Sequence, residues 1–321
     1  MTEPDERFER CAVQAAWRGD PMIGSAFPAA RLLLVEQPGP WGRAGLLTSR
    51  FDSAVAHRLV AQLERLGIRV VAIRRPGRHV ADGPRRWAVV DCRPDRERIT
   101  WGRFDDDHDL LELDVRGLLD PADRTVGESA PAYLVCAHGT HDACCAIRGR
   151  PVAAALEAHR PGTAWECSHV GGDRFAANLL ILPAGLLYGR VLPDDAARLV
   201  ELTDRGAVDA AGFRGRVGFS SVEQAAMAKA HEVHPEVGWR QVRVRAVQRS
   251  DPERILVQLW VGGVSVVMAV GVERADQAWL TCQSASPGRA MVYRPSVTTD
   301  AGSDNNQLTS QIGNINLFGV P

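Results

Sequence analysis

Seven cysteines are present in the 321-residue chain, and four of them fall between positions 136 and 167. Residues 136–145 read Cys-Ala-His-Gly-Thr-His-Asp-Ala-Cys-Cys, and residues 167–173 read Cys-Ser-His-Val-Gly-Gly-Asp. Thiolate and imidazole groups are ligands that suit zinc, copper and iron–sulfur clusters. An odd cysteine count without an N-terminal signal argues against a disulfide framework. The spacing therefore predicts a metal or cluster site formed by two converging loops.

The elements that flank these loops indicate how the ligands are positioned. A short buried strand over residues 132–135 leads into the first loop, and a helix over 143–159 begins at the pair Cys144 and Cys145. The N–H groups and dipole of a helix start stabilise thiolate charge. In the second loop, Gly171 and Gly172 allow the backbone to pass close to an inorganic core, because glycine has no Cβ.

Neighbouring groups are expected to have supporting roles. We expect His138 and His141 to orient the loop and Asp142 to cap the helix before Cys145. Cysteines outside the cluster are predicted to be small core residues: Cys11, Cys92 and Cys282. Two further histidines are predicted at the surface or at a helix cap: His231 and His234.

Hydrophobic periodicity divides the rest of the chain into two α/β units and a β segment. The first unit has the order β-α-β-β-β-α, over residues 31–36, 53–66, 69–73, 87–91, 98–104 and 107–119. The second has strands over 132–135, 178–182 and 187–191, and helices over 143–159, 194–204 and 221–231. From residue 239 the pattern alternates, which predicts antiparallel strands over 254–261, 264–271 and 278–283, with a hairpin turn at Gly262-Gly263.

The two cysteine segments resemble a known family. The strings Cys-Ala-His-Gly-x-x-Asp-x-Cys-Cys-Ala-x-x-Gly and Trp-Glu-Cys-Ser-His-Val-Gly-Gly-x-Arg-Phe-Ala-Ala-Asn are similar to those of the sucrase/ferredoxin-like family, which belongs with the thioredoxin-like ferredoxins. The resemblance is densest over residues 133–191. It is looser in the N-terminal half, at Glu-Gln-Pro-Gly-Pro-Trp-Gly from residue 36 and Arg-Arg-Pro-Gly from residue 74.

The resemblance implies an α/β fold with two thioredoxin-like α/β units, followed by a small C-terminal antiparallel β segment. The N-terminal unit without a cluster is predicted over residues 1–125, and the ferredoxin unit with the cluster site over residues 126–235. The β segment is predicted over residues 236–296, and a disordered tail over residues 297–321.

The cofactor implied by the resemblance is a [2Fe–2S] cluster. Relatives hold theirs with two cysteines and two histidines, the histidines lying as His-x-Gly-Gly-His, which maps the ligands onto Cys136, Cys145 and His169. Cys145 is preferred to Cys144 because relatives place that cysteine nine positions after the first. Asp173 stands where the second histidine is expected, so the fourth ligand is Asp173 or Cys167.

These ligands predict a soluble electron-transfer protein that works with unidentified redox protein partners. An iron with imidazole ligands carries less negative charge than an all-thiolate iron, which raises the reduction potential. An imidazole also couples electron gain to proton gain, so the potential is expected to depend on pH. Two alternatives remain open: a structural zinc-binding module, and a thiol enzyme in which Cys145 is the nucleophile and His141 or His169 the base.

Composition and charge exclude other classes. The formal net charge of −1 gives no reason to expect nucleic acid or an anionic membrane as a partner. No segment approaches the roughly 20 apolar residues that span a bilayer, and the N-terminus lacks the apolar part of a secretory signal, which predicts a cytoplasmic protein. No pair of carboxylates stands out as a glycosidase would require, so we do not expect a sucrose hydrolase.

Overall fold

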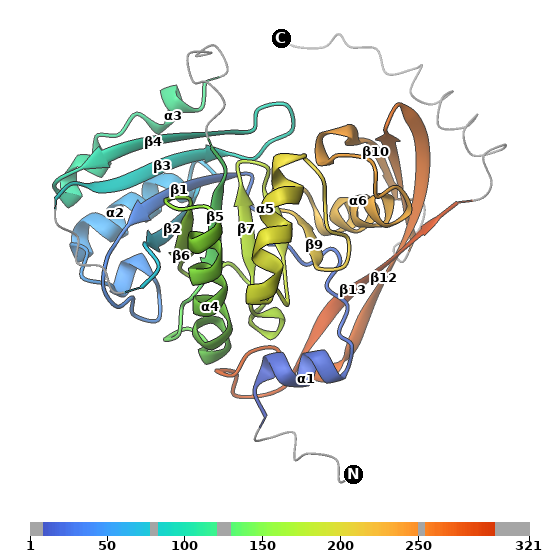
Figure 1. The fold of residues 1–321 in the computed structure, drawn as a ribbon, viewed down its shortest axis with the longest axis horizontal. Helices are drawn as coiled ribbons and strands as arrows, with labels where there is room; N and C mark the ends of the chain where they lie inside the picture. Colours follow the sequence, from blue (N-terminus) through green and yellow to red (C-terminus); the bar gives the residue numbers. More distant parts are fainter. Residues whose placement is uncertain (1–8, 78–82, 121–129, 250–253, 299–321) are drawn as a thin grey trace.

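Nine strands of the computed structural model form one curled mixed sheet, with a separate four-stranded sheet near the C-terminal end (Figure 1). The structure describes residues 9–77, 83–120, 130–249 and 254–298. The first half of the large sheet contains β1 (Arg31–Glu36), β2 (Arg69–Arg74), β3 (Arg85–Asp91) and β4 (Arg98–Phe104). The second half contains β5 (Ala132–Cys136), β6 (Ala164–Cys167), β7 (Leu179–Leu182), β8 (Leu186–Tyr188) and β9 (Phe213–Arg216).

Both halves of the sheet repeat one arrangement. The strand order is β4-β3-β1-β2 in the first half and β6-β5-β7-β8-β9 in the second. In each half the first two strands are parallel, and the third strand pairs antiparallel with the first. The structure thus confirms the predicted α/β class with repeated units.

The halves meet edge to edge where β2 pairs antiparallel with β6. At this junction Arg74 and Glu166 form an ion pair of 2.6 Å that is largely buried. The Arg75 guanidinium lies 3.6 Å from the ring centroid of Trp165, whose other neighbour is the stacked ring of Trp101. The boundary predicted at 125/126 lies outside the described residues, so the division into domains stays a prediction.

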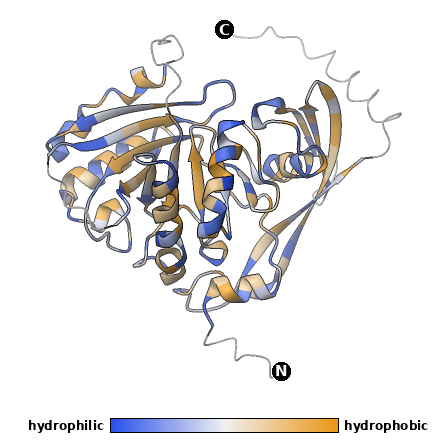
Figure 2. Ribbon diagram, viewed as in Figure 1, coloured by the Kyte–Doolittle hydropathy of each residue, from blue (hydrophilic) through white to orange (hydrophobic). Residues whose placement is uncertain are grey.

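The central strands of the large sheet are almost continuously apolar (Figure 2), and the residues of β1, β5, β6 and β7 are nearly all buried. Within the described residues, six α-helices accompany the two sheets. They are α1 (Cys11–Trp17), α2 (Ser53–Glu64), α3 (Val115–Leu118), α4 (Ala143–His159), α5 (Ala196–Asp204) and α6 (Ser221–Val233). All five residues of β5 are buried. The site loops therefore start from a rigid central strand.

The C-terminal sheet is antiparallel throughout, as predicted. Its strands are β10 (Val242–Arg249), β11 (Arg254–Val261), β12 (Val264–Ala278) and β13 (Gly288–Val297). Burial alternates along β10 and β11, and the buried side chains pack against α6. Gly262 and Gly263 form the predicted turn between β11 and β12, both with positive φ. The tail expected from residue 297 lies, beyond residue 298, outside the described residues.

Two predicted elements are wrong. Instead of one helix over 107–119, the chain has a 3-10 helix at Asp107–Leu111 and the short α3, because Asp106 and Asp114 each cap a separate turn. The strand predicted at 278–283 is absent: β12 continues to Ala278, and residues 279–283 form a loop, because Thr281 and Cys282 donate hydrogen bonds to the side chain of Asp142 instead of to a neighbouring strand. The sequence analysis gave no bounds for α1, β6, β9, β10 and β13.

No helix among the described residues is long and apolar enough to cross a membrane.

The buried side chain of His231 also differs from its predicted surface or cap position. It lies in α6 with 1% exposure, edge-on to the ring of Phe213. Burial lowers the pKa of His231 to about 4. His234 does cap the C-terminal end of α6.

We expect His231 to make the fold sensitive to acid. Its pKa in the unfolded chain is about 6.5, so the unfolded state takes up a proton that the folded state excludes. Stability is therefore lost as the pH falls from about 6.5 towards the folded pKa of about 4. The loss is at most about 3 kcal/mol for a difference of this size.

Urea unfolding at pH 7 and pH 4.5 measures this loss, which should be smaller in His231→Leu than in the wild type. The exposed His57 provides the control, since His57→Gln should behave as the wild type does. An equal loss in His231→Leu and the wild type would contradict the assignment.

Candidate metal centre

The site forms where two neighbouring parallel strands end. β5 and β6 pair in register, with Cys136 opposite Cys167 at their carboxyl ends. The loops that follow, residues 137–142 and 168–172, therefore leave the sheet side by side. Ligand sites in open α/β sheets form at such strand ends.

Three of the predicted side chains lie close together around these loops. The ligand atoms of Cys136, Cys145 and His169 all lie within 4.8 Å of one another. Cys136 is the last residue of β5, Cys145 lies in the first turn of α4, and His169 follows β6. This donor set combines two thiols and one imidazole, which suits an iron–sulfur cluster or zinc.

Asp173 lies beside this group and contacts two of its members. Its Oδ1 is 3.0 Å from His169 Nδ1 and accepts a hydrogen bond of 3.2 Å from the Cys145 thiol. Carboxylates commonly hold the non-ligating nitrogen of a metal-bound histidine, and Asp173 has the position for that role.

His141 also lies beside these groups, although the sequence analysis favoured a supporting role for it over that of a ligand by spacing. Its ring stacks on His169 with 3.7 Å between centroids, and its Nε2 lies 3.7 Å from Asp173 Oδ2. His141, His169 and Asp173 form a second group with ligand atoms within 4.8 Å of one another. The only sequence signal was its place in the loop before Cys145.

Proton affinities reflect this crowding. Hydrogen bonding to Cys145, and then to His169, lowers the pKa of Cys136 well below its usual range. The same contact with Cys136, together with burial, raises the pKa of Cys145. Burial would lower the pKa of His169, but Asp173 and Cys136 outweigh it and raise that pKa to about 9. Burial would likewise raise the pKa of Asp173, and the hydrogen bond with His169 lowers it instead.

His138 supports the loops, as predicted. It is buried, its Nε2–H donates to the Gly42 carbonyl at 2.7 Å, and its Nδ1 accepts from the His169 N–H at 3.2 Å. These two bonds fix the neutral tautomer, and burial lowers the pKa of the ring. His138 therefore joins the second loop to the N-terminal half of the protein.

The imidazole side of the centre is open, whereas the thiol side is closed. Cys136 and Cys145 have at most 1% exposure, while the His141 and His169 side chains are 31% and 23% exposed. A cavity of about 580 Å³ adjoins the three histidines His138, His141 and His169. Access from solvent is therefore through the histidines.

Two close contacts hold the ligand-bearing segments in place. Gly149 in α4 lies against the Cys136 carbonyl, where a Cβ would overlap the backbone. Gly172 lies against the guanidinium of the fully buried Arg214, which donates to the Gly171 carbonyl at 3.0 Å and to Asn178 Oδ1 at 2.7 Å. The glycine pair thus accommodates a buried cation beside the centre.

One comparison with known proteins identifies the family of the chain. The model of the sucrase/ferredoxin-like family matches residues 22–215, which is more than half of the chain. The chain belongs to the sucrase/ferredoxin-like family. No curated protein and no solved structure matches it.

Two further predicted residues lie apart from the centre of this sucrase/ferredoxin-like protein. Cys167 is fully buried opposite Cys136, but among the described residues it belongs to neither ligand group of the centre. Cys144 lies in a different group, together with Cys11, Asp142 and Cys282. The predicted ligand set stays a prediction, with Cys136, Cys145 and His169 as the members that the fold brings together.

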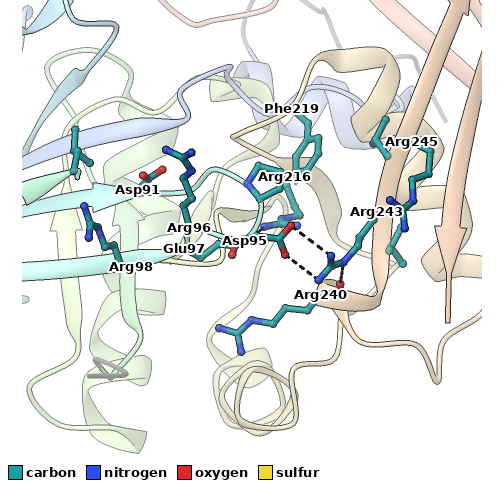
Figure 3. A pocket seen from close by; sticks show the side chains of 14 residues that line it. Asp91, Asp95, Arg96, Glu97, Arg98, Arg216, Phe219, Arg240, Arg243 and Arg245 are labelled. Carbon is teal, nitrogen blue, oxygen red and sulfur yellow. Dashed lines mark hydrogen bonds and ion pairs between the residues drawn. The ribbon is translucent and has the colours of Figure 1, made fainter. Parts of the chain in front are cut away.

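A separate cavity of about 650 Å³ lies between the β3–β4 turn and β10 (Figure 3). Six arginines line it, together with Asp91, Asp95 and Glu97. Each carboxylate pairs with an arginine: Asp91 with Arg93, Glu97 with Arg216, and Asp95 with Arg243. The described lining includes no cysteine or histidine, so this cavity is distinct from the candidate metal centre of the family member.

The Gly149→Ala variant should disturb the centre of this sucrase/ferredoxin-like protein. The added Cβ forces α4 away from the Cys136 carbonyl and so separates Cys145 from Cys136. Overpacking of this kind costs about 1–3 kcal/mol. We expect lower stability in urea and a lower metal content per chain.

Ala154→Gly is the matched control, because it alters an exposed position of the same helix and costs about 1 kcal/mol through helix propensity alone. It should keep the metal content of the wild type. Unchanged metal content in Gly149→Ala would show that the close contact does not position the ligands.

Proposed function

We propose that this member of the sucrase/ferredoxin-like family is a [2Fe–2S] electron-transfer protein. The observation that carries the proposal is the convergence of Cys136, Cys145 and His169, two buried thiols and a partly exposed imidazole, with His141 and Asp173 beside them. Such a cluster, when bound, supplies one-electron redox chemistry at a potential that nitrogen ligands raise.

The residues present fit the cluster. Cys136 and Cys145 share a hydrogen bond that lowers the pKa of Cys136 and raises the pKa of Cys145. The thiolate form of Cys136 is therefore stabilised before a metal is bound. The buried Arg214 places a positive charge near both thiols, which offsets part of the negative charge of a thiolate-ligated centre.

We propose His141 as the fourth ligand. Asp173 is hydrogen-bonded to Cys145 and lies against His169 Nδ1, which leaves His169 Nε2 for iron and makes Asp173 a positioning residue. His141 is stacked on His169 and reaches Asp173 with its Nε2. The chain thus supplies two histidines although Asp173 replaces the second histidine of the His-x-Gly-Gly-His pattern.

Electrons would enter and leave through the histidines. His141 and His169 line the cavity of about 580 Å³, whose walls also include Arg43, Glu64 and Arg69. Small transient interfaces are typical of redox partners. We propose a redox protein that docks at this opening, and a cytoplasmic location for the exchange.

The thiol-enzyme alternative has less support. A nucleophilic cysteine must be reachable as a thiolate. Cys145 is fully buried with a raised pKa, and Cys136, whose pKa is lowered, has 1% exposure. Zinc at the same three residues remains the competing occupant, and its signature differs from that of a cluster.

Protein purified without oxygen should be coloured, with absorption between about 320 and 600 nm and near two irons and two sulfides per chain. Cys136→Ala and Cys145→Ala should each lose the colour, iron and sulfide. Cys92→Ala, which removes a buried thiol outside both ligand groups, is the control and should keep them. A colourless wild type with zinc at Cys136 and Cys145 would refute the electron-transfer proposal.

The fourth ligand is tested by His141→Ala and Asp173→Asn. We expect His141→Ala to lose most of the cluster, and His141→Cys to retain it at a lower potential, because a thiolate adds negative charge to the iron. Asp173→Asn should keep the cluster, since an amide still hydrogen-bonds His169. A normal cluster content in His141→Ala together with loss of the cluster in Asp173→Asn would instead identify Asp173 as the ligand. Electron paramagnetic resonance of the reduced variants measures which of them holds a cluster.

A further inference from the structure

A second group of cysteines lies outside the candidate metal centre. Cys11, Cys144 and Cys282 come from three distant segments: the start of α1, the first turn of α4 and the loop between β12 and β13. Figure 1 shows α1 and the β12–β13 loop side by side below α4, next to the helix start that carries Cys144. Cys11 is buried, as predicted, whereas Cys282 is exposed and is not the core residue that the sequence predicted.

The three sulfur atoms form a nearly equilateral triangle. The Sγ–Sγ distances are 3.7 Å between Cys11 and Cys144, 3.6 Å between Cys144 and Cys282, and 3.5 Å between Cys282 and Cys11. A disulfide joins two sulfurs at about 2.05 Å. The triangle therefore consists of three separate thiols.

Asp142 places a carboxylate oxygen against the triangle. Its Oδ2 lies 3.6 Å from Cys11 Sγ, and the four ligand atoms of the group all lie within 4.8 Å of one another. Asp142 is completely buried. Its Oδ1 accepts from the Cys144 N–H at 2.8 Å, and its Oδ2 accepts from the Thr281 hydroxyl at 2.8 Å and the Cys282 N–H at 2.7 Å.

These distances match tetrahedral coordination of one metal ion. With Zn–S near 2.3 Å and Zn–O near 2.1 Å, a tetrahedral ion separates two sulfurs by about 3.8 Å and a sulfur from an oxygen by about 3.6 Å. The three sulfur–sulfur distances and the distance from Cys11 Sγ to Asp142 Oδ2 agree with these values within about 0.3 Å. Thiolates also prefer zinc among the common divalent ions, and a closed four-ligand set is typical of structural zinc sites.

Backbone N–H groups also donate hydrogen bonds to the sulfurs, which stabilises them as thiolates. The Cys11 N–H donates to Cys282 Sγ at 3.4 Å, and the Ala12 N–H donates to Cys144 Sγ. Hydrogen bonds of this kind orient ligands and offset their negative charge. Three cysteines and a carboxylate bound to one divalent ion leave two negative charges to be offset.

We propose that Cys11, Cys144, Cys282 and Asp142 form a structural zinc site. The ion would join α1 and the β12–β13 loop to the start of α4, in addition to the hydrogen bonds of Asp142. Cys144 and Cys145 then belong to different metal sites, one on each side of the helix start. The proposal does not depend on the electron-transfer function.

The test uses the full chain with the candidate metal centre disabled. A Cys136→Ser/Cys145→Ser double variant lacks both thiols of that centre, so zinc bound by thiolates in this variant would come from the group of Cys11, Cys144 and Cys282. Adding Cys11→Ser or Cys282→Ser should reduce zinc to background, whereas adding Cys92→Ser should not. Cobalt reconstitution of the double variant should give the intense visible bands of a tetrahedral thiolate site.

A second measurement covers variants that fail to fold. Cys282 is the exposed member of the group, so in the wild-type protein zinc should protect it from alkylation, and a chelator should accelerate its labelling many-fold. Labelling of Cys282 is measured by peptide mass spectrometry. Counting the free thiols of protein denatured without reductant shows whether a disulfide is present. A zinc-free double variant, an alkylation rate unaffected by the chelator, or a disulfide among the three cysteines would each overturn the proposal.

Discussion

The buried carboxylate of Asp142 is the contact on which the site region depends. As the N-cap of α4 it accepts the N–H of Cys144, and the same carboxylate holds Thr281 and Cys282 of the β12–β13 loop. An uncapped helix start would leave buried donors unsatisfied, which costs more than the bonds contribute. This one side chain therefore fixes where α4 begins and which way Cys144 and Cys145 point.

The start of α4 is constrained from the opposite direction by the central strand. Gly149 allows the helix to lie directly on the Cys136 carbonyl, so the spacing between Cys136 and Cys145 is set by backbone contact instead of by flexible side chains. Ligands held by rigid elements are more precisely placed than ligands on loops. The histidines, in contrast, come from loops and face the solvent, where a partner can approach.

A buried positive charge lies on the thiol side of the centre. The thiols lie inside, near the buried Arg214 guanidinium, whose pKa burial lowers to about 9. It remains charged at neutral pH, and it is held by four hydrogen bonds to Ser25, Gly171 and Asn178. A buried cation costs less when its donors are satisfied in this way, and it lowers the energy of negative charge at the centre.

The sequence by itself determined the elements with strong local signals and the candidate ligands that lie close in the chain. The strands at 31–36 and 98–104 and the helix at 143–159 follow from periodicity and capping, and Cys136, Cys145 and His169 follow from one motif. Only tertiary structure joined the two halves through β2 and β6 and brought His141 into the centre, whereas the break in the helix predicted at 107–119 comes from the local caps Asp106 and Asp114. Tertiary structure also brought together Cys11, Cys144 and Cys282, which are separated by more than 130 positions. Contacts between segments this far apart depend on how the elements pack, and no local sequence pattern predicts that packing.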